Sequence, residues 1–304
     1  MEKKGVLCVL LAALLFGLMP ITAKACYAHG VTPLFLTFLR FFLALPLLWI
    51  LDKSTRKKSS NTINIGEAGK IIFLSLMLGL TAAFNFLAYD YIPSSLAMTL
   101  HFIYPVVVLA LCGLIYRERL TTRQVLCCIL CMVGIVAFCS HTGTIDLKGV
   151  LYAVLSGFTY GGYITYLSRS GLQQRTRPFQ LMLIVQLVSS GIVLMMAIVK
   201  DAVKLDLDLV GWGLSALFAI GVTTATWLFM VGTKYCGPQT SALLSTLEPV
   251  VSIVIGVLAL NEQLTIRYVY GIICILLATL LTIWMNNNNT TKAERKMVDS
   301  DNNK

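Results

Sequence analysis

The segment Lys4-Gly5-Val6-Leu7 recurs in the second half of the chain as Lys148-Gly149-Val150-Leu151, at an offset of 144 residues. The same offset carries Pro105-Val106-Val107 onto Pro249-Val250-Val251. Further matches at this offset are Gly17 with Gly161, Phe35 with Phe179, Gly69 with Gly213, Tyr91 with Tyr235, and Glu118, Leu120, Thr121 and Arg123 with Glu262, Leu264, Thr265 and Arg267. One offset fits both ends of the chain, so insertions and deletions between the halves nearly cancel. The sequence therefore predicts two copies of one structural unit.

The composition excludes an ordinary soluble domain. Hydrophobic residues make up 57% of the chain and charged residues only 12%, whereas soluble domains carry about 25% charged residues. The mean hydropathy is +0.81. Apolar runs of about 20 residues alternate with short charged stretches, which is the pattern of membrane-spanning helices. We therefore expect an all-α polytopic membrane protein.

The apolar runs predict ten transmembrane helices, five in each copy. Proline and glycine mark several boundaries, as at Pro33, Pro178 and Gly237-Pro238, because these residues start or stop helices. The first run is too long for a cleaved signal peptide and matches the sixth, so it belongs to the fold. The expected helices lie near residues 5–28, 33–51, 70–92, 94–116, 122–140, 149–168, 178–199, 210–234, 238–261 and 266–285.

The distribution of basic residues predicts the orientation. With the N-terminus in the cytoplasm, 18 of the 24 Lys and Arg residues fall on the inner side and five on the outer side, and Arg40 lies within the second helix. Cytoplasmic loops carry such an excess, so both termini are expected in the cytoplasm, with the protein in the cell membrane. The net charge of +10 reflects this bias and not nucleic-acid binding. The run from Lys53 to Lys58 can touch anionic membrane lipid or form a solvated loop.

Five helices per copy is an odd number, so the two copies have opposite orientations and form an inverted repeat. We expect the first repeat over residues 1–140 and the second over residues 141–285. Residues 286–304 are rich in Asn and charge, so they are expected to form a disordered cytoplasmic tail. Inverted repeats of this kind are typical of secondary transporters, whose central site lies between the repeats.

Polar residues at membrane depth are the candidates for function, because each costs free energy there. Helical spacing places a polar set on one face of the ninth helix and an equivalent set on the fourth. These sets are Ser241, Ser245, Glu248 and Ser252, and Ser94, Ala97, His101 and Tyr104. The offset pairs His101 with Ser245 and Tyr104 with Glu248, and we expect both faces to meet at a shared cavity. Pro105 and Pro249 follow directly and can kink their helices there.

Glu248 lies about ten residues from either end of its predicted helix, near the middle of the bilayer. There it can carry a proton or pair with a cationic group of a substrate. The alternative is a neutral, hydrogen-bonded structural carboxyl. His101 can act as a proton relay or substrate contact, or as a satisfied histidine between helices.

A second group of residues can line the same cavity. Arg40 can bind a substrate carboxylate with two hydrogen bonds, or extend outward, or pair with Asp90. Tyr160, Tyr163 and Trp227 can form an aromatic surface or pack helices together, and Asn85 lies one turn from Thr81 and from Tyr89. Gly157 and Gly161 have the spacing that suits close packing of helices.

Nine cysteines lie in or beside the apolar runs. Cys128 and Cys131 have the spacing of a pair of metal ligands but lack a second pair, and a tetrahedral site needs more ligands. Small packing side chains are the better interpretation. We expect no metal, no cofactor and no disulfide framework.

The chain resembles the EamA-type transporters of the drug/metabolite transporter superfamily, from its start to about residue 285. The resemblance rests on matching motifs in the two halves: Phe38-Leu39-Arg40-Phe41, Ala97 through Tyr104-Pro105-Val106, and Glu118-Arg119-Leu120-Thr121, then Ser241-Ala242 through Glu248-Pro249-Val250, and Asn261-Glu262-Gln263-Leu264-Thr265. It implies ten helices in two inverted repeats that move small metabolites such as amino acids, usually outward. It also implies that Glu118 and Glu262 are structural or gating residues near loops.

The sequence therefore predicts a secondary transporter, an exporter of a small organic metabolite whose transport can be coupled to protons. The expected substrate-binding residues are His101, Tyr104, Ser245, Glu248, Arg40, Asn85, Tyr160, Tyr163 and Trp227. No nucleotide-binding motif appears, so ATP-driven transport is unsupported. A membrane-embedded enzyme that uses Glu248 and His101, and a channel, are the alternatives. The first would normally carry a denser set of catalytic groups, and the second a filter-like loop.

The predicted topology can be tested by labelling single cysteines with a membrane-impermeant thiol reagent. Cysteines introduced at Ser59 and at Asp206 are expected to react from opposite sides, because an odd number of helices separates these positions. The unsubstituted chain, labelled in parallel, gives the background of the native cysteines. Labelling of both positions from one side would contradict the inverted ten-helix topology.

Overall fold

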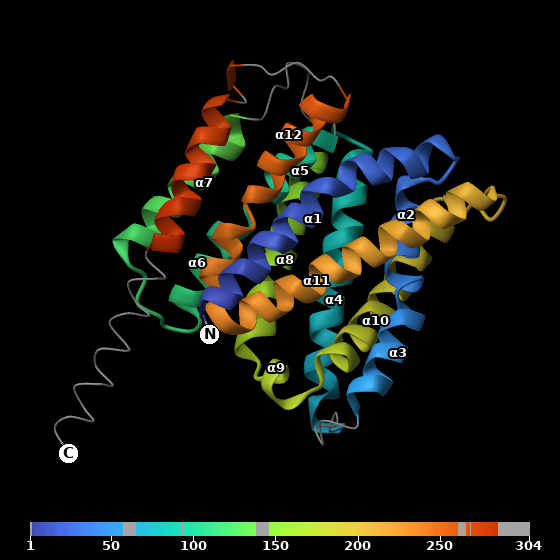
Figure 1. Ribbon diagram of the computed structural model, residues 1–304, viewed down its shortest axis with the longest axis horizontal. Coiled ribbons are helices and arrows are strands. Elements are labelled where there is room, and N and C mark those ends of the chain that lie inside the picture. Colours follow the sequence, from blue (N-terminus) through green and yellow to red (C-terminus); the bar gives the residue numbers. More distant parts are fainter. Residues whose placement is uncertain are drawn as a thin grey trace.

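The computed structural model describes residues 2–56, 65–92, 94–137, 146–260, 266–267 and 269–284, and within these ranges the regular structure is helical. The elements are α1 (Glu2–Ala28), α2 (Pro33–Phe42), α3 (Leu45–Arg56), η1 (Ile65–Glu67), α4 (Ala68–Tyr89), α5 (Ser94–His101), α6 (Tyr104–Leu114), α7 (Thr122–Ala137), α8 (Leu147–Arg169), α9 (Leu172–Arg175), α10 (Pro178–Val199), α11 (Leu209–Leu244), α12 (Leu247–Leu260) and a last helix, Val269–Trp284. They follow the expected order of helices (Figure 1). The tail 286–304 and Glu262 lie outside the described residues.

Six helical stretches of the described chain are long and apolar enough to cross a membrane by length and composition. They are Lys3–Ala28, Pro33–Thr55, Ala68–Tyr89, Leu96–Leu114, Pro178–Val199 and Leu209–Leu244, and shorter apolar helices occur at Thr122–Ala137, Leu247–Leu258 and Val269–Trp284. The prediction of an all-α polytopic membrane protein is therefore confirmed.

Three of the predicted helices are divided in the structure, and a proline explains each division. Proline has no N–H, so the carbonyl four residues before it loses its helical partner. Pro46 follows the end of α2 at Phe42 by four residues, and Pro105 follows the end of α5 at His101 by the same distance. Pro249 stands four residues after Ser245, the C-cap of α11. Pro105 and Pro249 are equivalent in the repeat, so both copies contain the same break.

The predicted boundary between the eighth and ninth helices is a sharp kink inside α11. At Gly237 the backbone takes φ 81° and ψ 166°, which glycine adopts easily because it has no Cβ. Pro238 follows and cannot continue the preceding helix. The segment from Pro238 to Leu244 and α12 then form the ninth predicted helix in two pieces.

The two repeats pack crosswise. The first helix of each repeat lies against the third helix of the other, which gives the pairs α1 with α11 and α8 with α4. The first helix of each also packs on the broken fourth helix of the other, α1 on α12 and α8 on α5 and α6. At the flank, α7 runs beside Val269–Trp284 (Figure 1), where a Cβ on Gly134 would lie 2.7 Å from Ile275.

Glycines show that these crosswise contacts are equivalent. A Cβ on Gly17 would lie 2.5 Å from the Cβ of Val251 and 2.9 Å from the Glu248 carbonyl oxygen. A Cβ on Gly161 would lie 2.8 Å from Val107 Cγ1 and 3.2 Å from the Tyr104 carbonyl oxygen. The partners in the two contacts differ by the same 144 residues as the glycines, so the sequence repeat is also a repeat of packing.

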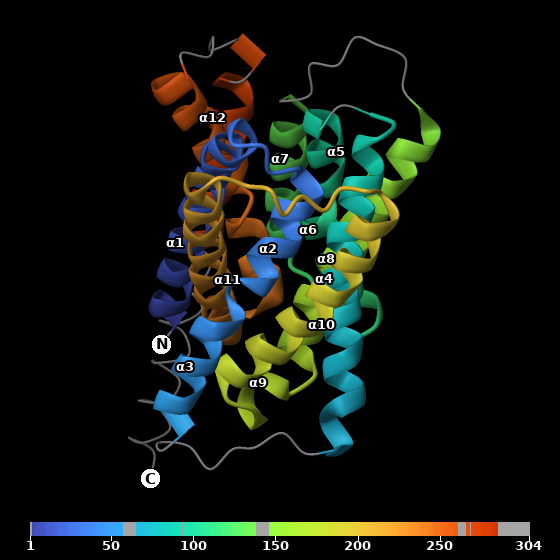
Figure 2. The same cartoon turned by 90° about the vertical axis from the view of Figure 1, so that its right-hand side faces the viewer.

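Figure 2 shows the bundle from the side, with α9 near one end. The charged residues at the two ends differ. We call the end that includes α9 and η1 the arginine end, because it carries Arg169, Arg175 and Arg177. The opposite end carries His29, Asp90, Lys200 and Asp208, at the ends of α1, α4 and α10 and the start of α11.

Replacement of Gly17 by Ala is expected to lower thermal stability, because the added methyl group overlaps Val251 and the Glu248 carbonyl. Overpacking of this kind costs about 1–3 kcal/mol. Gly161→Ala is expected to act in the same direction. Gly221→Ala is the matched control, since a Cβ there meets nothing within 4 Å. Melting of the purified variants in detergent measures the effect, and equal stability of Gly17→Ala and Gly221→Ala would contradict the packing argument.

Candidate functional site

The breaks in the two fourth helices bring the main candidate residues together at the centre of the bundle. The Tyr104 hydroxyl and the Ser245 hydroxyl form a buried hydrogen bond of 2.6 Å. Ser245 also donates to the carbonyl of Ala242 at 3.0 Å. Tyr104 belongs to the first repeat and Ser245 to the second, so this bond ties one break to the other.

His101 lies beside this bond and is buried. Its Nδ1 is 2.9 Å from the Ser156 hydroxyl, and Ser156 is within 3.4 Å of the Asn85 side-chain oxygen. The His101 ring lies 5.6 Å from the ring of Tyr104 and 5.4 Å from that of Tyr160, measured between centroids. The structure thus joins α4, α5 and α8 through one polar network.

Arg40 and Glu248 lie close enough to interact electrostatically but do not form an ion pair. Each interacts with the charge of the other, yet within the described residues no carboxylate oxygen lies within 4 Å of the Arg40 guanidinium. The Nε of Arg40 is buried without a hydrogen-bond partner, and its Cζ lies 4.6 Å from the centre of the Phe41 ring. Both side chains remain partly accessible to solvent.

Tyrosines surround these two charges. Tyr160 interacts electrostatically with both Arg40 and Glu248, and its ring packs edge-on against Tyr104 at 4.9 Å. Tyr163 continues this surface with a nearly parallel ring 6.1 Å from that of Tyr160. Tyr89 is also close enough to Arg40 for electrostatic interaction. The charges therefore stand in an aromatic and polar environment, where low polarity strengthens their attraction for a ligand.

A small cavity lies next to this site, between α4, α8, α10 and α11. Tyr163 borders it, and the other lining residues are Leu74, Leu78, Leu167, Leu181, Met182, Val185, Gln186, Thr226 and Met230. The Gln186 side chain is buried, and its Oε1 has no hydrogen-bond partner. The cavity extends from Tyr163 toward the arginine end.

The structure also tests two alternatives that the sequence left open, the packing role of Trp227 and an ion pair between Arg40 and Asp90. The Trp227 ring stacks on Phe179 at 5.9 Å, which matches the helix-packing alternative for this residue. Asp90 forms an ion pair with Lys200, so the expected alternative of an ion pair between Arg40 and Asp90 is not found.

At the end of the bundle opposite the arginine end, His29 Nδ1 lies 2.8 Å from Asp208 Oδ2. The Gly211 N–H and then His29 hold the pKa of the Asp208 carboxyl below its usual value.

Ser156 is the site residue that the sequence reasoning missed. The neighbouring Gly157 is the feature of the sequence that could have indicated Ser156. A Cβ at Gly157 would lie 2.7 Å from the His101 carbonyl oxygen, so the helix must carry glycine at this contact. The Gly157 and Gly161 spacing therefore brings α8 against the break between α5 and α6. Ser156 reaches His101 as a result of that close approach.

The cysteines of α7 pack against neighbouring helices. Cys131 Sγ lies 3.2 Å from the Thr246 hydroxyl, and Cys127 and Cys128 are buried in a cluster with Leu109 and Leu243. In the part of the chain that the structure describes, no three His, Cys, Asp or Glu side chains are grouped to hold a metal ion.

Comparison with known proteins gives a consistent result. The model of a family described as the EamA-like transporter family matches residues 3–139 and 147–284. Similar proteins are an uncharacterized transporter of Archaeoglobus fulgidus (26% identical, over 63% of this chain and 66% of that protein), one of Synechocystis sp. (25%, over 88% and 89%) and one of Bacillus subtilis (21%, over 88% and 88%). A solved crystal structure superposes with a TM-score of 0.82 at 16% identity, over 94% of this chain and 99% of that one.

The bond between Tyr104 and Ser245 predicts an asymmetric effect on stability. Ser245→Ala leaves the buried Tyr104 hydroxyl without a partner, which costs about 1–3 kcal/mol. Tyr104→Phe leaves Ser245 bonded to Ala242, so the loss is expected near the usual net value of about 1 kcal/mol. The double variant should resemble Tyr104→Phe alone. Unfolding of the four proteins in detergent measures the coupling, and strictly additive losses would show that the bond does not form.

Proposed function

The chain belongs to the EamA-like transporter family, and on that basis we propose that it is a secondary transporter of a small zwitterionic metabolite, such as an amino acid. The carrier would bind its substrate between the repeats and expose it to each side of the membrane in turn. Integral membrane transport fits the family and the apolar helices.

The observation that carries this proposal is the separated pair of opposite charges, Arg40 and Glu248. A charged side chain in the membrane interior is costly unless it is paired, and such residues commonly mark substrate and ion pathways. Here Arg40 and Glu248 interact electrostatically, but they are not among the ion pairs within 4 Å that the described residues form. A ligand that carries both charges can satisfy both residues at once.

An α-amino acid has this arrangement of charges. Its carboxylate can accept two parallel hydrogen bonds from the Arg40 guanidinium, a geometry that arginine favours. Its ammonium group can donate to Glu248, and the rings of Tyr160 and Tyr163 offer an aromatic surface to the side chain. His101, Tyr104, Ser245 and Asn85 would hold the helix breaks in position around the ligand.

Alternation between two states follows from the inverted repeat, since each half can adopt the conformation of the other. We propose that the arginine end faces the cytoplasm, in keeping with the excess of basic residues there. The direction is proposed as export, as in the family that the sequence resembles. Proton coupling is proposed through Glu248, whose protonated carboxyl group would release its proton when the substrate ammonium binds to the resulting carboxylate and would take a proton up again when the substrate leaves.

Counterflow in proteoliposomes with a panel of labelled amino acids tests transport directly. Saturable exchange is expected for at least one of them, and a protein that is folded but exchanges no zwitterion would overturn the proposed substrate class. Chemical conversion of the substrate would instead indicate an enzyme.

Paired variants and ligands test the assigned contacts. Glu248→Gln is expected to weaken binding of the amino acid roughly 10- to 100-fold, as for loss of a hydrogen bond to a charged group. This variant should no longer distinguish the amino acid from the 2-hydroxy acid that lacks the ammonium group. Arg40→Gln should likewise lose discrimination against the amino acid amide, which lacks the carboxylate. Arg123→Gln removes an exposed charge on α7 and serves as the control.

The pH dependence of transport tests the proton role of Glu248. Wild-type rates are expected to change between about pH 5 and pH 8, because a carboxylate that carries a proton must titrate within the cycle. Glu248→Gln should flatten this profile. A folded Glu248→Gln variant with the wild-type profile would make this carboxyl structural.

A further inference from the structure

Among the described residues, five ion pairs connect side chains, and each joins the first repeat to the second. Three lie at the arginine end: Asp52 with Arg177, Glu67 with Arg175, and Glu118 with Arg169. In all three, a carboxylate of the first repeat meets an arginine of the segment 169–177 in the second. We call these three pairs the clasp.

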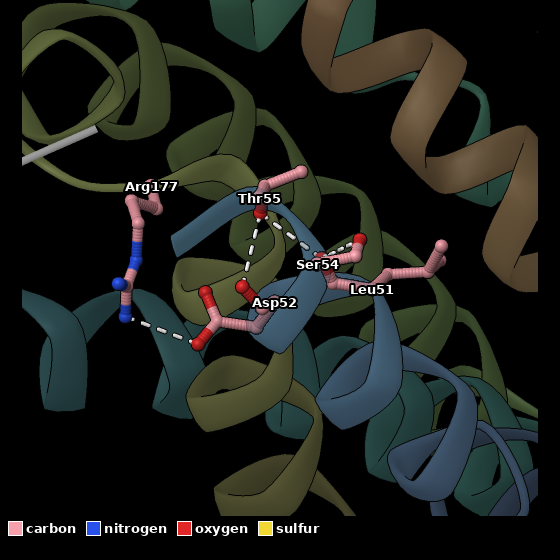
Figure 3. A network of polar contacts seen from close by, with 5 residues as sticks. All are labelled: Leu51, Asp52, Ser54, Thr55 and Arg177. Atoms are coloured by element: carbon pink, nitrogen blue, oxygen red, sulfur yellow. Dashed lines mark hydrogen bonds and ion pairs between the residues drawn. The ribbon is translucent and has the colours of Figure 1, made fainter. Parts of the chain in front are cut away.

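The pair between Asp52 and Arg177 is the most buried part of the clasp. Figure 3 shows the Arg177 guanidinium directed at the Asp52 carboxylate. Arg177 Nη2 lies 3.0 Å from Asp52 Oδ2, and the two side chains are 5% and 14% exposed. By contrast, the side chains of the pairs at the opposite end, Asp90 with Lys200 and His29 with Asp208, are between 35% and 53% exposed. The most buried of the five pairs therefore lies at the arginine end.

The pair between Glu118 and Arg169 connects the clasp to the central site. Arg169 Nη2 lies 2.6 Å from Glu118 Oε1, and Gln239 donates to Glu118 Oε2 at 2.9 Å. Gln239 stands directly after the kink of α11, in the short segment that ends at Ser245. Movement at Glu118 would therefore be transmitted to the helix break that holds Ser245 and Glu248.

We infer that the clasp is the cytoplasmic gate of this transporter, and that the structure shows the conformation closed toward the cytoplasm. This inference rests on the proposed function, because a gate requires an alternating cycle. Opening separates Asp52 and Glu118 from the arginines of segment 169–177. It joins the cavity beside Tyr163 and Gln186 to the cytoplasm, which gives the substrate a path to Arg40 and Glu248.

The chemistry of the clasp suits a gate better than a permanent lock. Arg177 Nε, Arg177 Nη1 and Asp52 Oδ1 are buried without hydrogen-bond partners. A buried ion pair is stabilising only when its remaining polar atoms are satisfied. Water that enters on opening would hydrate these atoms and Gln186 Oε1, which is also buried without a hydrogen-bond partner. Hydration of these atoms would offset part of the free energy that is lost when the ion pair separates.

Hydrogen–deuterium exchange of the protein in lipid nanodiscs tests the gate without any transport assay. Asp52→Asn keeps the size of the side chain but removes its charge, and Arg177→Gln removes the charge of the partner. Both variants are expected to raise exchange at the arginine end, in peptides that cover residues 169–181, roughly fivefold or more. They should slow exchange at the opposite end, in peptides that cover residues 200–211, because one end closes as the other opens.

Arg123→Gln is the control, since Arg123 is an exposed arginine of α7 and belongs to none of the three pairs of the clasp. It should behave like the wild type. Faster exchange at both ends in Asp52→Asn and Arg177→Gln would show a loss of stability and overturn the gate, as would unchanged exchange. Opposed changes in a protein that transports nothing would retain the gate and reject the proposed function.

Discussion

The architecture depends on the contact between a glycine in the first helix of each repeat and the broken fourth helix of the other. Gly17 meets Val251 and the Glu248 carbonyl, and Gly161 meets Val107 and the Tyr104 carbonyl, at distances where a Cβ would collide. Only glycine allows this approach, since it leaves the backbone of one helix open to the other. The main chain at Tyr104 and Glu248 is therefore held by the opposite repeat, and neither half can form the site alone.

This constraint explains why interrupted helices are tolerated in the membrane interior. A break exposes backbone groups that cannot be satisfied by lipid, so it must be enclosed by protein or line a hydrated space. At the first break, the His101 carbonyl faces Gly157 of α8. At the second, the Ser245 carbonyl accepts a hydrogen bond from the Glu248 N–H at 3.0 Å. The close packing of the repeats that encloses these breaks also brings the Tyr104 hydroxyl within 2.6 Å of the Ser245 hydroxyl.

Features fixed by local chemistry could be predicted from the sequence, and features fixed by partners across the bundle could not. The repeat, the kink at Gly237-Pro238 and the breaks before Pro105 and Pro249 follow from residue types alone. The break before Pro46 was not predicted, and the equivalent position in the second repeat is Ser190, in the continuous helix α10. Ser156 was missed because its role depends on which helix Gly157 approaches. The separation of Arg40 from Glu248 likewise depends on packing between repeats.

That separation also relates binding to movement. Arg40 belongs to the first repeat and Glu248 to the second, so a ligand that bridges them acts on the relative position of the halves. A ligand can shift a conformational equilibrium only by its difference in affinity for the two states. A ligand that bridges the repeats differs in affinity for the two states, because the distance between the Arg40 guanidinium and the Glu248 carboxylate changes when the repeats move. A ligand bound by one repeat alone would lack this dependence, so the placement of the two charges on different repeats allows occupancy of the site to influence which end is open.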